Sequence, residues 1–125
     1  MSQENVELIK RIYDLWATGD STRELIDPDL EYVNPPNAVE SGVKFGRRSL
    51  AAIREVYPDF RVEPERFVDA GDEVVVLGVA RGTSAAGIEA QWRQGYVWTI
   101  REHRAARLRW FNDPAEALKA VGLEE

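Results

Sequence analysis

Two polar side chains at the end of a short predicted strand suggest a site for a small molecule. Tyr32 and Asn34 are two residues apart in the segment 31–34, so on a strand they share one face. Pro35 and Pro36 then end the strand. An aspartate at position 34 could transfer a proton, whereas Asn34 can only hold a ligand or the neighbouring side chains of a site in place by hydrogen bonds. This pair therefore predicts a polar anchor and not an acid–base group.

The clearest strand pattern lies at residues 88–100, where large side chains alternate with mostly polar ones. Two interpretations remain open: a filled aromatic core with satisfied O–H and N–H groups, or an apolar pocket with a few polar anchors. Four tryptophans in so small a chain favour some cavity, because large rings on a curved sheet leave gaps. The predicted inward side chains are Tyr13, Trp16, Tyr32, Asn34, Trp92, Gln94, Tyr96, Trp98, Trp110 and Asn112.

Few groups with acid–base or metal-binding chemistry fall on this predicted inward face. The only histidine, His103, lies in a predicted hairpin turn, and the carboxylates fall in loops, helix ends or outward strand positions. Arg81, at the end of a central strand, is the best candidate for an inward cation. The sequence has no phosphate loop and no dinucleotide fingerprint. No metal and no cofactor are expected.

Composition excludes several classes of partner. The chain has 125 residues, the size of a single domain (1–125), with a net charge of -6 and a pI of about 4.9. Nucleic acid is not expected as a partner, because neutralising phosphates needs a basic face. No segment predicts a membrane span or a signal peptide. The absence of cysteine excludes disulfides and is consistent with the cytoplasm, where we expect the protein.

The hydrophobic periodicity places these residues on helices followed by strands. A first helix runs from Ser2 to Gly19, and an S-x-x-E capping box at Ser21 predicts a short second helix. A strand at 31–34, a loop at 37–45 and a third helix at 46–57 come next. Strands follow at 60–69, 74–80, 88–100 and 106–112, with a last helix from Asp113. This order predicts an α+β fold whose curved, antiparallel-rich sheet wraps around the N-terminal helices.

Over nearly its full length the chain resembles the SnoaL-like branch of the NTF2-like superfamily. The resemblance rests on "NVELIKRIYDLWATGD", "IDPDLEYVNPP", "FGRRSLAAIREVYPDF", "VDAGDEVVVLGVARG", "YVWTI" and "DPAEALKAVGL" in this order. It implies a cone-shaped α+β barrel, a pocket between helices and sheet, and a homodimer. Val97, Thr99 and Phe111 on the outward sheet face would then be interface residues.

Comparison with enzyme relatives implies that the usual acids are missing. In steroid-isomerase relatives the general base is an aspartate at the position of Asn34, and the oxyanion-binding residues fall at Ile12 and Tyr96. Limonene-epoxide-hydrolase relatives carry a Tyr-x-Asn pair that matches Tyr32 and Asn34. Their Arg-x-Asp, however, reads Arg81-Gly82-Thr83 here, and their second aspartate falls at Trp110.

These considerations predict a pocket protein that binds a polyketide-, steroid- or terpenoid-like apolar ligand. Whether it turns the ligand over is open. If it is an isomerase, cyclase or hydratase, Asn34, Tyr32 and Tyr96 would polarise an oxygen, with Arg81 assisting. The predicted ligand-binding residues are Tyr13, Trp16, Trp92, Gln94, Trp98 and Trp110. The alternative is a non-catalytic dimeric adaptor or protein-interaction module whose aromatic residues only fill the core.

Overall fold

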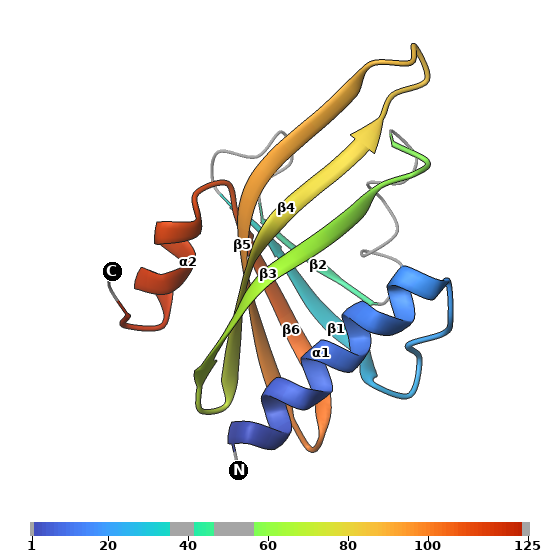
Figure 1. Ribbon diagram of the computed structural model, residues 1–125. Coiled ribbons are helices and arrows are strands. Elements are labelled where there is room, and N and C mark those ends of the chain that lie inside the picture. Colours follow the sequence, from blue (N-terminus) through green and yellow to red (C-terminus); the bar gives the residue numbers. More distant parts are fainter. Residues whose placement is uncertain (1, 36–41, 47–56, 124–125) are drawn as a thin grey trace.

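Within the described residues, a six-stranded, strongly curved sheet carries one helix on each face. The computed structural model describes residues 2–35, 42–46 and 57–123 (Figure 1). In chain order the elements are α1 (Ser2–Thr18), β1 (Ile26–Asn34), β2 (Gly42–Phe45), β3 (Arg61–Ala70), β4 (Glu73–Thr83), β5 (Glu89–Arg101), β6 (Arg104–Phe111) and α2 (Pro114–Ala120). The predicted α+β class and the long strand meander are confirmed.

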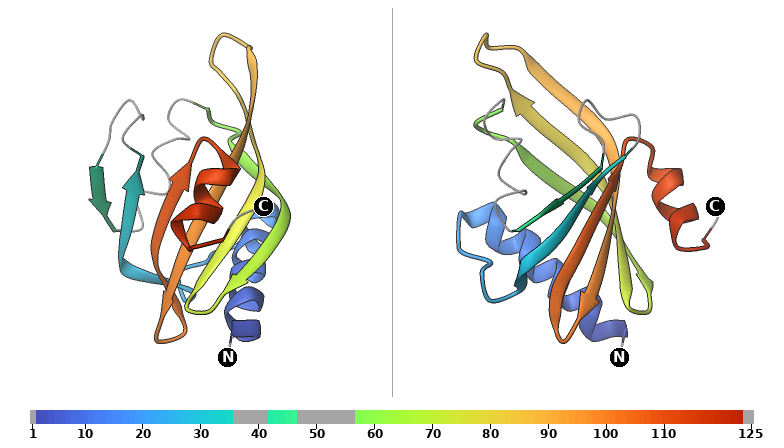
Figure 2. Two further views of the ribbon diagram at one scale, coloured as in Figure 1. Left: turned by 90° about the vertical axis from the view of Figure 1, so that its left-hand side faces the viewer. Right: turned by 180° about the vertical axis from the view of Figure 1, so that it is seen from behind.

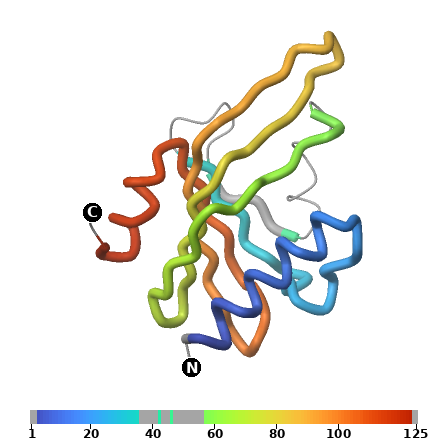
Figure 3. Tube along the Cα trace, viewed as in Figure 1, coloured from blue at the N-terminus to red at the C-terminus, as the bar shows by residue number. Residues whose placement is uncertain are grey.

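The strands lie in the order β2-β1-β6-β5-β4-β3, with β1 and β6 parallel and every other neighbouring pair antiparallel. The sheet is open among the described residues, with β2 and β3 as its edges. Figures 1 and 2 show α1 across the concave side and α2 on the opposite side, and Figure 3 traces the same path. Pro64 lies in edge strand β3, where the pairing register shifts between Pro64 and Arg66. This is the environment expected for a proline in a strand.

The predicted second helix is wrong. Ser21 Oγ accepts a hydrogen bond from the backbone N–H of Arg23, the Leu25 N–H donates to the Thr22 carbonyl, and β1 begins at Ile26. The segment forms a turn because too few residues precede Pro28 to repay the cost of nucleating a helix.

Two neighbouring predictions also change. The predicted loop at 37–45 contains β2, whose Gly42–Phe45 segment pairs antiparallel with the end of β1. The strand predicted at 31–34 starts five residues earlier than expected, at Ile26. Residues 47–56 of the predicted third helix lie outside the described residues.

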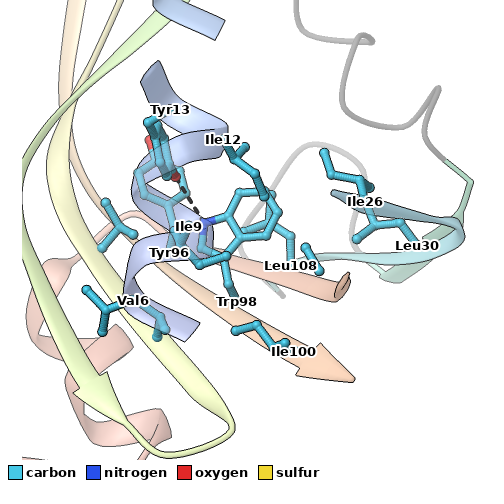
Figure 4. Packing of buried hydrophobic residues seen from close by; sticks show 13 residues of the cluster. Val6, Ile9, Ile12, Tyr13, Ile26, Leu30, Tyr96, Trp98, Ile100 and Leu108 are labelled. Carbon is cyan, nitrogen blue, oxygen red and sulfur yellow. Dashed lines mark hydrogen bonds between the residues drawn. The ribbon is translucent and has the colours of Figure 1, made fainter. Parts of the chain in front are cut away.

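Two hydrophobic clusters form on the two faces of the sheet. The inner cluster joins α1 to the concave face and contains fully buried Ile9, Ile12 and Trp98 (Figure 4). The outer cluster joins α2 to the convex face through Val75, Val97, Ala117 and Leu118. Gly95 permits this second contact, because a Cβ added there would lie 2.5 Å from the Ala117 Cβ.

The convex face also corrects one interface expectation. Val97 is fully buried under α2 within the chain, so it cannot belong to a surface that contacts another molecule. Among the described residues, no helix is long and apolar enough to cross a membrane.

Candidate functional site

A cavity of about 250 Å³ lies on the concave side of the sheet. It is bounded by α1, β1, β3, β5, β6 and the segment before β3. Its lining consists of aromatic, aliphatic and uncharged polar side chains. These are Tyr13, Trp16, Tyr32, Phe60, Val62, Trp92, Gln94, Tyr96, Leu108, Trp110 and Asn112.

Strand alternation explains why these residues meet. Trp92, Gln94 and Tyr96 lie at every second position of β5, so they project from one face. The pairing register sets Tyr96 beside Trp110 of β6, on the same face. Two-residue periodicity in the sequence is therefore sufficient to assemble one wall of the cavity.

The inner face of β4 changes from larger to smaller side chains along the strand. The inner positions of β4 begin with bulky Val74 and Val76 and continue with Gly78 and Ala80. Gly78 pairs with Gln94 and Ala80 pairs with Trp92. The glycine at position 78 lets β3 approach closely, because a Cβ added there would lie 2.6 Å from the Glu63 carbonyl oxygen.

The polar groups of the lining are joined by side-chain hydrogen bonds. The Tyr96 hydroxyl donates to Gln94 Oε1 at 2.6 Å, and Gln94 Nε2 donates to Asn112 Oδ1 at 3.3 Å. On the next strand, Trp110 Nε1 donates to Asn34 Oδ1 at 2.7 Å. The three amide oxygens around the cavity thus each accept a hydrogen bond already.

Tyr13 is held from behind by Trp98. The buried Trp98 Nε1 donates to the Tyr13 hydroxyl oxygen at 3.1 Å, as the dashed line in Figure 4 shows. The Tyr13 ring makes edge-to-face contacts with Trp16 (5.4 Å between centroids), Phe67 (6.0 Å) and Trp98 (6.0 Å). Three perpendicular ring contacts and one hydrogen bond fix the orientation of this phenol.

The phenols of the cavity remain protonated at neutral pH. Burial raises the pKa of Tyr32 to about 12 and the pKa values of Tyr13 and Tyr96 further still. Charge repulsion adds to this effect. An ionised Tyr32 would raise the pKa of Tyr13, and an ionised Tyr13 or Tyr32 would raise the pKa of Tyr96. The three hydroxyls are close enough to interact and can only serve as hydrogen-bonding groups at neutral pH. Among the described lining residues there is no carboxylate, histidine, lysine or arginine.

Most of the side chains predicted to bind a ligand line the cavity. Those found in the lining are Tyr13, Trp16, Tyr32, Trp92, Gln94, Tyr96 and Trp110. Asn34 and Trp98 lie one layer behind it, bonded to Trp110 and Tyr13 respectively. Their roles in binding or chemistry stay predictions.

The expectation that Arg81 faces inward is wrong. Arg81 shares the face of β4 with Val75 and Leu77, which belong to the outer cluster. Its side chain bonds to Glu63 Oε1 at 2.7 Å and to Gln91. The inward alternation of β4 ends on Gly82 and not on Arg81, so the cation is placed on the convex side.

Three lining residues, Phe60, Val62 and Leu108, are not among the site residues predicted from the sequence. Phe60 immediately precedes β3 and Val62 lies in it, two positions further on, and this alternation is the signal that could have identified them. Among the described residues, no group of three or more His, Asp or Glu is able to hold a metal ion.

The sequence and fold agree on one family. Residues 9–108 match the SnoaL-like domain family. The chain belongs to the SnoaL-like family. No curated protein matches it. The NTF2-like fold expected from the sequence is confirmed by the solved structures that resemble this SnoaL-like protein.

Three of those structures illustrate the likeness. TerC, co-crystallised with polyporic acid, is 28% identical over 94% of this chain and 98% of its own, with a TM-score of 0.74. An NTF2-like protein of unknown function from Burkholderia pseudomallei K96243 is 23% identical over 95% and 98%, with a TM-score of 0.74. A loop-truncation variant of IdmH is 24% identical over 93% and 98%, with a TM-score of 0.68.

Proposed function

We propose that this SnoaL-like protein binds a small, uncharged, largely apolar ligand of the polyketide, steroid or terpenoid type in the concave cavity. The observation that carries the proposal is the lining itself: aromatic rings enclose about 250 Å³, with hydroxyl and amide groups as the polar atoms. A few polar anchors in an apolar, concave site are the usual construction of a small-molecule site.

The volume limits the size of the ligand. An apolar cavity of ~150 Å³ accommodates benzene, and sites for drug-sized ligands start at ~300 Å³. A cavity of about 250 Å³ lies between these values. It is suited to a compact ligand of two fused rings, or to one ring system of a longer molecule that extends through the mouth.

The lining also limits the charge of the ligand. Burying an ionised group without a partner is strongly unfavourable, and the described lining offers no side chain of opposite charge. The ligand is therefore neutral where it is enclosed. Its oxygen atoms would be bound by hydroxyl and amide groups.

TerC supports an aromatic ligand. It is the structure most similar in sequence among the three described above, and it was co-crystallised with polyporic acid. The likeness in fold makes aromatic, oxygen-bearing molecules suitable first probes for the present chain. Because the described lining has no cation, neutral aromatic ketones should bind it better than polyporic acid, which is ionised at neutral pH.

Turnover in this cavity would depend on polarising a ligand oxygen. General acid–base catalysis needs a group whose pKa lies near neutral pH, and the pKa values of the three phenols are raised far above it. The described lining can therefore donate hydrogen bonds to an oxygen but supplies no general base. An isomerisation or cyclisation would have to draw its base from the ligand or from water.

A non-catalytic adaptor is the alternative, and it requires no cavity. The observed volume favours the ligand-binding proposal over it. A homodimer remains compatible with both functions and does not distinguish them.

The experiment is a thermal-shift screen with polyporic acid, aromatic polyketides, steroids and terpenoid epoxides. A ligand present at ~100 times its Kd adds ~2.7 kcal/mol of stability, which raises the melting temperature by several degrees in a chain of this size. Val62→Phe places a ring in the cavity and should abolish the shift. Val68→Phe, the matched control on the same strand against the outer cluster, should retain it.

Absence of any shift across the panel would contradict the proposal. So would a shift that survives in Val62→Phe, because the ligand would then bind elsewhere. In either case the adaptor function becomes the better hypothesis, and a search for protein partners follows.

A further inference from the structure

We propose that Tyr13, held in place by Trp98, is the hydrogen-bond donor that selects a carbonyl oxygen in the ligand. This inference rests on the proposed function and adds to it the chemical group of the ligand and the residue that binds this group. Trp98 acts as a positioning residue, because it contacts Tyr13 and lies outside the cavity lining.

The amide oxygens around the cavity are already in use. Each of them accepts one hydrogen bond: Asn34 Oδ1 from Trp110, Gln94 Oε1 from Tyr96, and Asn112 Oδ1 from Gln94. A neutral phenol can donate one proton and accept at its oxygen. The groups that still have a proton to donate therefore determine which ligand atoms the site can bind.

The three phenols differ in this respect. Tyr96 uses its proton on Gln94 Oε1 at 2.6 Å, so its oxygen can only accept. Tyr13 receives the Trp98 N–H on its oxygen at 3.1 Å and keeps its own proton for another acceptor. Tyr32 has no hydrogen-bond partner within the part of the chain that the structure describes. Tyr13 and Tyr32 are thus the hydroxyl donors of the site.

Tyr13 is the better placed of these two donors. Its side chain is 5% exposed and its ring is fixed by three aromatic neighbours, whereas Tyr32 is only half-buried. Accepting the Trp98 N–H also polarises the Tyr13 O–H bond, because hydrogen bonds in a chain strengthen one another. A fixed, polarised donor in a dry site is the arrangement that favours an oxygen with high electron density.

A carbonyl oxygen matches this surplus of donors better than the other oxygen groups. It has two lone pairs and no proton, so it can accept from Tyr13 and Tyr32 without needing an acceptor in return. A ligand hydroxyl would bring a proton that needs an acceptor; the amide oxygens already accept one hydrogen bond each, so this hydroxyl would have to reach the Tyr96 oxygen or compete for an amide oxygen. A carboxylate would enter a cavity whose described lining has no cation.

The test compares two molecules of the same carbon skeleton, α-tetralone and tetralin, which differ by one carbonyl oxygen. Calorimetric titration should give ~3- to 10-fold tighter binding of α-tetralone, the worth of one neutral hydrogen bond. The infrared carbonyl band of bound α-tetralone should move to lower frequency than in an apolar solvent. The absence of cysteine leaves no thiol to react with the ketone.

Variants then assign the donor. Tyr13→Phe should remove most of the preference for the ketone and most of the shift of the carbonyl band, and Tyr32→Phe should remove less of both. Trp98→Phe should retain binding and reduce the band shift, a change that loss of packing alone would not cause. Tyr57→Phe is the matched control: it removes a phenol that lies outside the cavity lining, with its ring edge-on to Trp92 at 5.2 Å, and should leave the band where it is in the wild-type protein.

The outcomes separate the two proposals. Failure of both molecules to bind would overturn the proposed function. Equal binding of both molecules to the wild-type protein, or an unshifted carbonyl band, would overturn the carbonyl inference while the pocket stands. A carbonyl band that is unchanged in Tyr13→Phe, or that moves as far in Tyr32→Phe as in Tyr13→Phe, would overturn the assignment of Tyr13 as the selecting donor.

Discussion

On its concave face the sheet meets α1 through aromatic rings that carry hydrogen-bonding groups, whereas on its convex face it meets α2 through small aliphatic side chains. The concave side leaves a cavity of about 250 Å³. On the convex side Gly95 and Ala117 approach so closely that one added Cβ would collide. Rings with fixed directions do not fill a curved surface completely, while small side chains do.

Charge is divided between the same two faces. Near the convex face, Glu73 Oε2 receives a hydrogen bond from Arg109 at 2.9 Å and lies 3.7 Å from Arg107. The described cavity lining contains neutral groups only. The convex face therefore pairs its charged groups, although the buried Arg109 Nε has no hydrogen-bond partner among the described residues, and the concave face leaves neutral donors available to a ligand.

The largest effect is expected at the centre of the concave cluster. Trp98→Ala removes a fully buried indole together with its hydrogen bond to Tyr13. Its free energy of unfolding should fall by ~3–5 kcal/mol, the usual loss for deleting a buried aromatic side chain. Urea unfolding measures this loss. Trp92→Ala, at a half-buried position of the lining, should lower the free energy of unfolding by less. Equal losses in the two variants would contradict the assignment of Trp98 to the buried core and of Trp92 to the cavity lining.

The close contact on the convex face can be broken by one methyl group. In Gly95→Ala the new Cβ would lie 2.5 Å from the Ala117 Cβ, so α2 must shift at a cost of ~1–3 kcal/mol. Adding Ala117→Gly should recover part of this loss, and a double-mutant cycle measures the coupling. Purely additive effects would show that the two residues do not meet. Binding of ligands on the concave side should be unchanged.

Alkaline pH should act on the concave face through its phenols. Burial raises the pKa of Tyr32 from 10.0 to about 12, so between these values the folded chain holds a proton that the unfolded chain has lost. Stability therefore falls as the pH rises above 10, by about 1.4 kcal/mol per pH unit for this group.

A combined titration measures this effect. Tyrosinate absorbance should rise together with loss of the far-ultraviolet circular dichroism signal, and Tyr32→Phe should weaken the pH dependence of stability. Full tyrosinate absorbance near pH 10 in a protein that is still folded would contradict the burial of the phenols.

The smallest effect concerns the amide behind the lining. Asn34→Ala leaves the Trp110 N–H without its acceptor and should cost about 1 kcal/mol, since the site is half-buried. Asn112→Ala, at an exposed position, should cost a few tenths of that. Thermal unfolding of both variants provides the comparison. A larger loss in Asn112→Ala would show that Trp110 does not depend on Asn34.

Strand periodicity accounts for what the sequence predicted correctly. The alternation through Trp92, Gln94 and Tyr96 identified one wall of the cavity, and the last helix predicted from Asp113 is α2, which Asp113 caps. These features depend on residues close together in the sequence, where local geometry decides the outcome.

Other features depend on pairing between distant segments. Strand β2 exists because Gly42–Phe45 pairs with β1, and its own sequence carries no alternation strong enough to reveal it. Arg81 was predicted to face inward, but the inward positions of β4 are the even-numbered ones. Because side chains alternate along a strand, an error of one position assigns a residue to the wrong face of the sheet. Trp98 was predicted to touch a ligand, but Tyr13 of α1 lies over it, a contact between residues 85 positions apart.

The central claim is that a neutral ligand binds on the concave face and leaves the convex face untouched. The measurement is a methyl NMR titration of the wild-type protein with α-tetralone, observing Val62 and Leu108 in the cavity lining and Val97 and Leu118 under α2. We predict saturable shifts of the Val62 and Leu108 methyl signals and no change at Val97 and Leu118. Unmoved lining signals, or equal shifts on both faces, would contradict the assignment of the cavity as the binding site.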